Sequence, residues 1–184
     1  DTTLPRLYDA THTIKSDMPY LLMLPVGIPL VEAVSGVSKP NRKKMAQVMF
    51  DHCSEALAAA LSLNVCHSDL GPDNIVVSGE KFIVVDWGLA RAPNVAIHEY
   101  KGRLPFMSDR LVQYFADLDY GRIDATDVEP FLPQYDVDAL TIVQYAVERG
   151  KPHLAVPWAN EMGKGLIRRR KLFLECGDAT ATGL

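Results

Sequence analysis

The chain has 184 residues, of which 48% are hydrophobic and 23% charged, and its formal net charge is −4 at pH 7. This hydrophobic content is too high for a disordered chain, and the length suits one domain that buries roughly 70% of its unfolded surface. The mildly acidic balance argues against a dedicated nucleic-acid-binding protein, because such proteins carry an excess of basic residues.

Two β-strands are predicted at the amino end, over residues 4–15 and 20–26, because both runs are apolar, β-branched or aromatic. Residues 16–19 have the composition of a turn between them. Gly27 interrupts the pattern before a short helical stretch over residues 30–34.

The strongest helix signal begins at Pro40 and ends near Asn64, with apolar residues three and four positions apart. Two β-rich runs follow, over residues 75–77 and 82–85, and the polar residues 78–81 between them predict a hairpin.

The rest of the chain is predicted to be mostly helical. Irregular residues 91–106 precede a helix over 108–118 and an acidic loop over 119–133. A second buried helix is expected over residues 135–147, where Gly150 stops it. A last helix is expected over residues 158–176, with a solvated basic face at 168–171.

No membrane span or signal peptide is apparent, because no apolar run approaches ~20 residues and no basic stretch precedes an apolar one at the amino end. Cys53, Cys66 and Cys176 form no C-x-x-C pair, and their odd number indicates reduced, mostly buried thiols. We therefore expect an intracellular protein, in the cytoplasm or nucleus, without a membrane or nucleic-acid partner.

The residues with the clearest chemistry lie just after the long helix. Asp69 and, five positions later, Asn74 occupy one loop, and the hairpin then brings Asp86 to the end of an apolar strand. Phosphoryl transfer needs one carboxylate to accept the proton of the attacking hydroxyl, and oxygen ligands to hold Mg²⁺ against a triphosphate. Asn74 and Asp86 carry the hard oxygens that Mg²⁺ prefers.

Two segments resemble motifs of the eukaryotic protein-kinase superfamily. Residues 67–74, which begin His67-Ser68-Asp69-Leu70 and end at Asn74, resemble H-R-D-L-x-x-x-N, and Asp86-Trp87-Gly88 resembles D-F-G. The resemblance implies that Asp69 is the catalytic base and that Asn74 and Asp86 bind Mg²⁺. His67 would pack the loop. It further implies an α+β fold with a mostly helical carboxyl lobe, short β-hairpins and a partial amino lobe.

The resemblance extends to both sides of these motifs. Residues 20–27 look like the strand and hinge between kinase lobes, where backbone groups of Leu24 and Val26 would meet adenine and Val76 would pack beneath it. Residues 1–27 would then be the partial amino lobe with the hinge, and residues 28–184 the carboxyl lobe.

Residues 102–108, Gly-Arg-Leu-Pro-Phe-Met-Ser, look like the end of an activation segment, and residues 136–140 like the start of the helix that anchors the catalytic loop. This form is most similar to fungal-type protein kinases and related effector kinases. The resemblance implies a Ser/Thr protein kinase that uses ATP and Mg²⁺ on a protein substrate.

Three departures from the family pattern matter. Ser68 replaces the usual Arg, so control by a phosphorylated activation segment is not expected. Gly71 replaces a Lys that contacts the phosphate, a loss of about 3–4 kcal/mol of transition-state stabilisation. No Gly-rich loop or V-A-I-K-type lysine precedes Leu4, and Lys15 lies too close to the hinge. We expect the catalytic domain to be incomplete in this chain.

Two other functions stay open. Small-molecule phosphotransferases of the aminoglycoside- or choline-kinase type share H-x-D-L-x-x-x-N and often an Asp-Trp like Asp86-Trp87, but typically lack a segment like residues 102–108. A pseudokinase module would instead bind partners through the acidic loop at 117–129 and the helix around Arg168.

Overall fold

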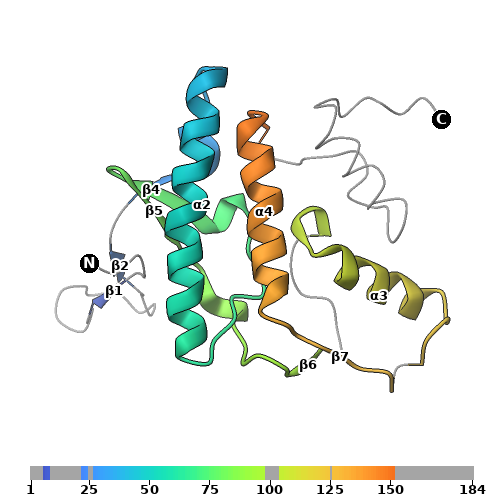
Figure 1. Cartoon of the computed structure of the whole chain (residues 1–184). Coiled ribbons are helices and arrows are strands. Elements are labelled where there is room, and N and C mark those ends of the chain that lie inside the picture. Colours follow the sequence, from blue (N-terminus) through green and yellow to red (C-terminus); the bar gives the residue numbers. More distant parts are fainter. Residues whose placement is uncertain (1–5, 9–21, 25–26, 98–103, 125, 152–184) are drawn as a thin grey trace, which may run out of the picture.

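The computed structural model describes residues 6–8, 22–24, 27–97, 104–124 and 126–151. Its fold is mixed α+β, as predicted, with helices and small antiparallel sheets (Figure 1). The helices are α1 (Leu30–Val34), α2 (Lys39–Ser62), α3 (Asp109–Asp119) and α4 (Gln134–Glu148). The strands are β1 (Arg6–Tyr8), β2 (Leu22–Leu24), β3 (Ile28–Pro29), β4 (Ile75–Ser78), β5 (Lys81–Val84), β6 (Ala96–Ile97) and β7 (Glu129–Pro130).

Helices α2 and α4 lie side by side and run in opposite directions (Figure 1). Buried residues recur along α2 every three or four positions, which places them on one face against α4. At the rim, Gln144 Nε2 donates to Gln47 Oε1 at 3.2 Å. The larger core lies between these helices and the β4–β5 hairpin and includes Leu30, Met49, Cys53, Ala56, Leu57, Leu70, Ile75, Val84, Leu140, Val143, Ala146 and Val147.

Strand β4 pairs with both β3 and β5 in a three-stranded antiparallel sheet. Gly79 supplies the turn between β4 and β5 with a φ of +61°. Gly27 precedes β3, and a Cβ there would lie 2.6 Å from the Val77 carbonyl oxygen, so only glycine fits. The sheet packs on α2 and ends where the candidate site begins.

A smaller core lies beside α3 and under the short β6–β7 ladder. It consists of Cys66, Ile97, Leu111, Phe115, Phe131 and Tyr135. The backbone of Cys66 pairs with that of Arg91 in an isolated antiparallel β-bridge. No helix in the described part of the chain is long and apolar enough to cross a bilayer.

The predicted elements agree with the structure where it is described. Both long helices, the α1 stretch, the hairpin and α3 begin and end within two residues of the expected bounds. Of the amino-terminal strands, β1 and β2 pair as an antiparallel ladder, and the rest of that region lies outside the described residues, as does the predicted helix 158–176. Cys53 and Cys66 are buried free thiols, whereas Cys176 is not among the described residues.

Two segments expected to be irregular each contain a two-residue strand. β6 lies within the region predicted to be irregular, and β7 lies within the predicted acidic loop. A two-residue strand has no alternation of apolar and polar residues that a sequence pattern could detect.

Candidate active site

His67 is fully buried and joins the loop after α2 to the strand end after β5. Its Nε2 lies 3.0 Å from the Val85 carbonyl oxygen, and its Nδ1 accepts from the Asp69 amide at 3.3 Å. A carbonyl only accepts, so the proton belongs on Nε2 and the lone pair on Nδ1. The ring also meets Trp87 edge-on, with centroids 4.7 Å apart. His67 therefore fixes the loop relative to the strand end.

Asn74 holds Asp69 from the other end of the same loop. Its Nδ2 donates to the Asp69 carbonyl oxygen at 2.7 Å and to Asp69 Oδ2 at 3.3 Å. The Asp69 Oδ1 atom is buried and has no hydrogen-bond partner among the described residues. Asp69 is thus an oriented carboxylate with one oxygen available, and Asn74 keeps its side-chain oxygen for another ligand.

Asp86 is placed beside this loop by the Val85 peptide. The Val85 amide donates to the Asn74 carbonyl oxygen at 2.9 Å, while the Val85 carbonyl faces His67. Asp86 follows at once, with φ 61° and ψ 65°. This left-handed conformation costs a non-glycine residue energy and persists only where its surroundings enforce it. Asp86 is exposed, and its Oδ1 accepts from the Gly88 amide at 3.4 Å.

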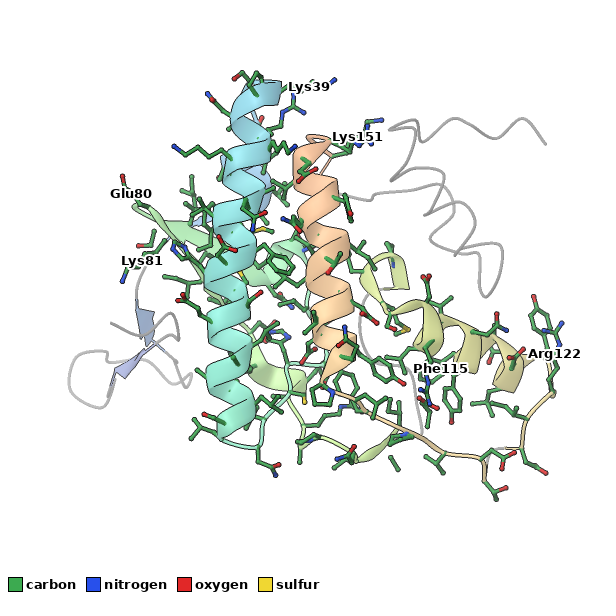
Figure 2. The ribbon with its side chains drawn as sticks, viewed as in Figure 1. Lys39, Glu80, Lys81, Phe115, Arg122 and Lys151 are labelled. Atoms are coloured by element: carbon green, nitrogen blue, oxygen red, sulfur yellow. The ribbon has the colours of Figure 1, made fainter. Side chains whose placement is uncertain are left out.

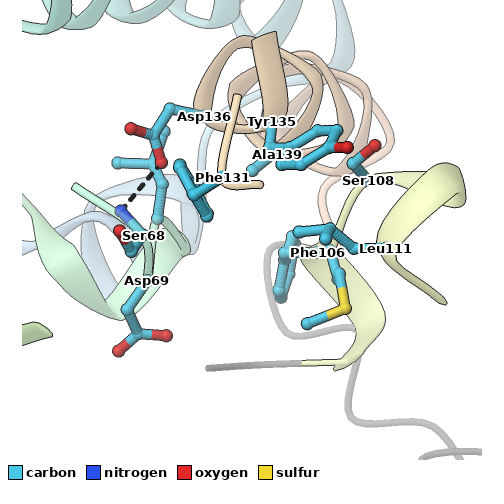
Figure 3. A pocket seen from close by; sticks show the side chains of 11 residues that line it. Ser68, Asp69, Phe106, Ser108, Leu111, Phe131, Tyr135, Asp136 and Ala139 are labelled. Atoms are coloured by element: carbon cyan, nitrogen blue, oxygen red, sulfur yellow. Dashed lines mark hydrogen bonds between the residues drawn. The ribbon is translucent and has the colours of Figure 1, made fainter. Parts of the chain in front are cut away.

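The buried carboxylate of Asp136, from the start of α4, anchors the loop across the molecule. Its two oxygens accept from the His67 amide at 2.7 Å and from the Ser68 amide at 2.9 Å, and Figure 3 shows the second of these bonds. Burial raises the pKa of Asp136, against the two backbone hydrogen bonds, which lower it. Ser68 is also left-handed, with a φ of 69°. Loop and helix are thus joined through one side chain.

A small cavity of about 30 Å³ lies next to Asp69 (Figure 3). This volume can hold one water molecule. Residues 106–108 form one wall, the loop that carries Asp69 forms another, and α3, α4 and Phe131 contribute the rest. The residues are Ser68, Asp69 and Leu70, then Phe106, Met107 and Ser108, and finally Leu111, Phe131, Tyr135, Asp136 and Ala139. The segment that resembles an activation-segment end therefore lies against the loop that carries Asp69.

The structure joins Asp69 and Asn74 by side-chain hydrogen bonds and brings the strand end before Asp86 to the same loop through Val85, whereas the expected adenine contacts lie partly outside the described residues. Val76 is half-buried on β4, opposite Ile83. Leu24 is described as part of strand β2 only, and Val26 lies outside the described residues.

The donor chemistry fits Mg²⁺. Magnesium is usually held by one or two carboxylates together with substrate phosphates and water. Asp86 offers a carboxylate and Asn74 an amide oxygen, and the Val85 amide, next to Asp86 in the chain, donates to the Asn74 backbone carbonyl. No group of three His, Cys, Asp or Glu side chains that could hold a metal occurs within the described ranges.

Two contributors have no signal in the sequence. The Val85 peptide acts through its backbone, which any residue would supply. Arg91 lies over the Phe131 ring, with its guanidinium carbon 5.4 Å from the centroid, and bridges to Cys66 before the loop. Such contacts depend on the tertiary fold and not on local spacing.

The comparisons with known proteins add no relative. No protein-family model matches the chain, and no curated protein matches it significantly in sequence. The interpretation of the site therefore depends on its own residues and geometry.

Proposed function

We propose that this chain is the catalytic part of an ATP-dependent Ser/Thr protein kinase, with a kinase-like carboxyl lobe and a partial amino lobe. The observation that carries the proposal is the Val85 peptide, which is bonded on one side to Asn74 and on the other to His67. Through it the loop with Asp69 and the strand end with Asp86 become one unit.

Asp69 acts as the base in this proposal. Asn74 occupies Oδ2, which leaves the unpartnered Oδ1 to accept the proton of a substrate hydroxyl as that oxygen attacks phosphorus. A carboxylate held in one orientation places the hydroxyl as well as deprotonating it.

Asn74 and Asp86 would hold Mg²⁺, and backbone groups of Leu24 and Val26, with Val76, would bind adenine. Bound Mg²⁺-ATP supplies the electrophilic γ-phosphoryl group and neutralises its charge. The left-handed backbone at Asp86 turns this carboxylate out of the strand direction at the point where the strand ends.

The segment that lies beside Asp69 and resembles the end of an activation segment favours a protein substrate over a small molecule. Met107 and Ser108, with Phe106, line the cavity next to the loop, where a peptide would pass the base. The alternatives are a small-molecule phosphotransferase, which has the same chemical residues, and a pseudokinase with none of the activity.

The test is transfer of radiolabelled phosphate from Mg²⁺-ATP to casein by the full chain, with Mg²⁺-dependent binding of a fluorescent ATP analogue as a second readout. We expect Asp69→Asn to lower transfer about 10²- to 10⁴-fold with binding retained. Asp86→Asn should weaken binding only when Mg²⁺ is present. Asp73→Asn, an exposed carboxylate in the same loop, is the matched control.

Each alternative predicts a different result. Transfer to an aminoglycoside or choline in place of casein would favour the small-molecule enzyme. Neither transfer nor Mg²⁺-dependent nucleotide binding by the parent chain would favour the pseudokinase. Equal nucleotide binding by the parent and Asp86→Asn in Mg²⁺ would remove the metal role of Asp86.

A further inference from the structure

A dense group of basic residues occupies the end of the molecule where α2 begins and α4 ends. Figure 2 shows Lys39 and Lys151 at this same end. Among residues 39–44 and 145–151, only Glu148 is acidic. The group, called here the cationic end, consists of Lys39, Arg42, Lys43, Lys44, Arg149 and Lys151.

The two halves of the cationic end are in direct contact. Arg42 Nε donates to the Val37 carbonyl oxygen at 2.9 Å, which fixes the guanidinium. That guanidinium lies on Gly150, where a Cβ would come 1.5 Å from Arg42 Nη1. Gly150 lies between Arg149 and Lys151 in the sequence, so this contact joins the start of α2 to the segment that carries these two basic residues.

The start of α2 adds positive potential of its own. The first turn contains no acidic residue, and the side chain of Ser38 makes no capping hydrogen bond. A helix amino end carries a partial positive charge and normally attracts acidic side chains. Basic residues there, with Lys39, Lys43 and Lys44 all exposed, oppose the usual pattern. An anion from another molecule would relieve this conflict at the start of α2.

The charge of the rest of the chain limits what that anion can be. Glu148 is the one acidic residue beside the cationic end, and the other described residues include 15 acidic and five basic ones. A long polyanion, such as a nucleic-acid duplex or a bilayer surface, would also face that acidic remainder and be repelled by it. A short acidic segment would meet the cations with Glu148 as the one nearby carboxylate in the two sequence ranges.

We propose that the cationic end is a docking surface for a short Asp/Glu-rich segment of a partner protein. The proposal does not depend on phosphoryl transfer, because binding needs neither ATP nor Asp69. The cationic end lies at the opposite end of α2 and α4 from the loop that carries Asp69. In a protein kinase, such a surface would hold a substrate by a segment remote from the phosphorylated residue.

The test measures binding of a short fluorescein-labelled polyglutamate peptide to the full chain by fluorescence anisotropy. We expect Lys39→Gln, Lys43→Gln and Lys44→Gln together to weaken binding about tenfold, since each exposed pair contributes a small and additive part. Added salt should weaken binding to the parent protein much more than binding to the triple variant.

The control variant lowers the net charge by three, as the lysine variant does, but at positions outside the cationic end. Ala59→Glu, Ser62→Glu and Thr126→Glu together add three negative charges at exposed positions away from the cationic end. Parent-like affinity of this control supports the proposal, and circular dichroism checks that both variants keep their helices. Equal peptide affinity of the parent and the lysine variant would overturn it. So would tighter binding of the parent to phosphatidylserine vesicles or single-stranded DNA than to the peptide.

Discussion

The two hydrophobic cores of this molecule are closed in different ways. The larger core, between α2, α4 and the hairpin, is built from apolar side chains, most of them aliphatic. The smaller core is closed by polar groups: Tyr135 donates its hydroxyl hydrogen to Glu129, and Glu129 also accepts from Arg110 at 2.8 Å. The candidate active loop spans both cores, because Cys66 belongs to the smaller one and Leu70 to the larger. The larger core thus excludes water by packing alone, whereas the smaller one also depends on polar bonds.

The largest expected effect is on thiol chemistry, which reports how well each core excludes water. Burial raises the pKa of Cys53, in the larger core, from 9.0 to about 12, and that of Cys66, in the smaller core, to about 11. At pH 8 the thiolate fraction falls about tenfold per unit of raised pKa, so we expect about thousandfold slower labelling of Cys53 than of an ordinary thiol. Cys66 should be about hundredfold slower. Labelling should accelerate as the pH rises.

Ellman's reagent on a Cys176→Ser background measures both rates, and the same protein in denaturant gives the ordinary rate. Single variants Cys53→Ser and Cys66→Ser assign each phase. If Cys53 reacts before Cys66, or if either matches the denatured rate, the larger core is not the drier of the two.

The second effect is on the bond that ties the loop to α4. Asp136→Ala removes the acceptor of two buried or half-buried amides, those of His67 and Ser68. Each orphaned donor costs about 1–3 kcal/mol, so we expect the free energy of unfolding to fall by roughly 3–5 kcal/mol in urea titrations. Asp136→Asn keeps one carbonyl acceptor and should lose about half as much.

Asp138→Ala is the matched control, because Asp138 lies two positions after Asp136 on the same helix. Its Oδ1 accepts a hydrogen bond from the exposed side chain of Gln134, four positions earlier. It should change the free energy of unfolding by about 0.5 kcal/mol or less. A loss from Asp136→Ala no greater than that of the control would show that the loop is held by packing instead.

The long elements could be predicted because their signals are local. Apolar residues recur along α2 with helical spacing, and the glycine-containing turn after β4 predicts the hairpin. The spacing of Asp69, Asn74 and Asp86 likewise predicts one site, and the bonds of the Val85 peptide bring the loop with Asp69 and Asn74 next to the strand end before Asp86. Their catalytic roles stay predictions.

The rest could not be predicted because it depends on contacts between distant residues. His67 and Asp136 are 69 positions apart, and neither has a pattern that pairs it with the other, although the kinase resemblance places a loop-anchoring helix there. The left-handed backbone of Asp86 is uncommon for a residue other than glycine and is held by the surrounding bonds. Arg42 against Gly150 joins two basic segments that sequence spacing alone would leave separate.

The third effect tests the polar rim of the smaller core. Burial, followed by the hydrogen bond to Glu129, raises the pKa of the Tyr135 hydroxyl. Glu129→Ala leaves this hydroxyl without its acceptor, and we expect about 1–2 kcal/mol of destabilisation in urea titrations. Arg110→Ala removes only the exposed partner and should cost much less. Equal losses from the two variants would mean that the ion pair, and not the tyrosine bond, closes this core.

The smallest effect is expected at the outer loop after α3. Arg122 Nη1 lies 2.9 Å from Asp117 Oδ1, but 58% of the Arg122 side chain is exposed, and its guanidinium also lies over the Tyr120 ring. Water screens such a pair, so Arg122→Ala should lower the free energy of unfolding by no more than about 0.5 kcal/mol, and added salt should reduce even that. A larger, salt-independent loss would show that the stacking on Tyr120 matters more than the charge. The contrast with Asp136 follows from burial. The carboxylates of Asp117 and Asp136 accept hydrogen bonds of similar length, but only the removal of the buried Asp136 carboxylate leaves its donors without access to water.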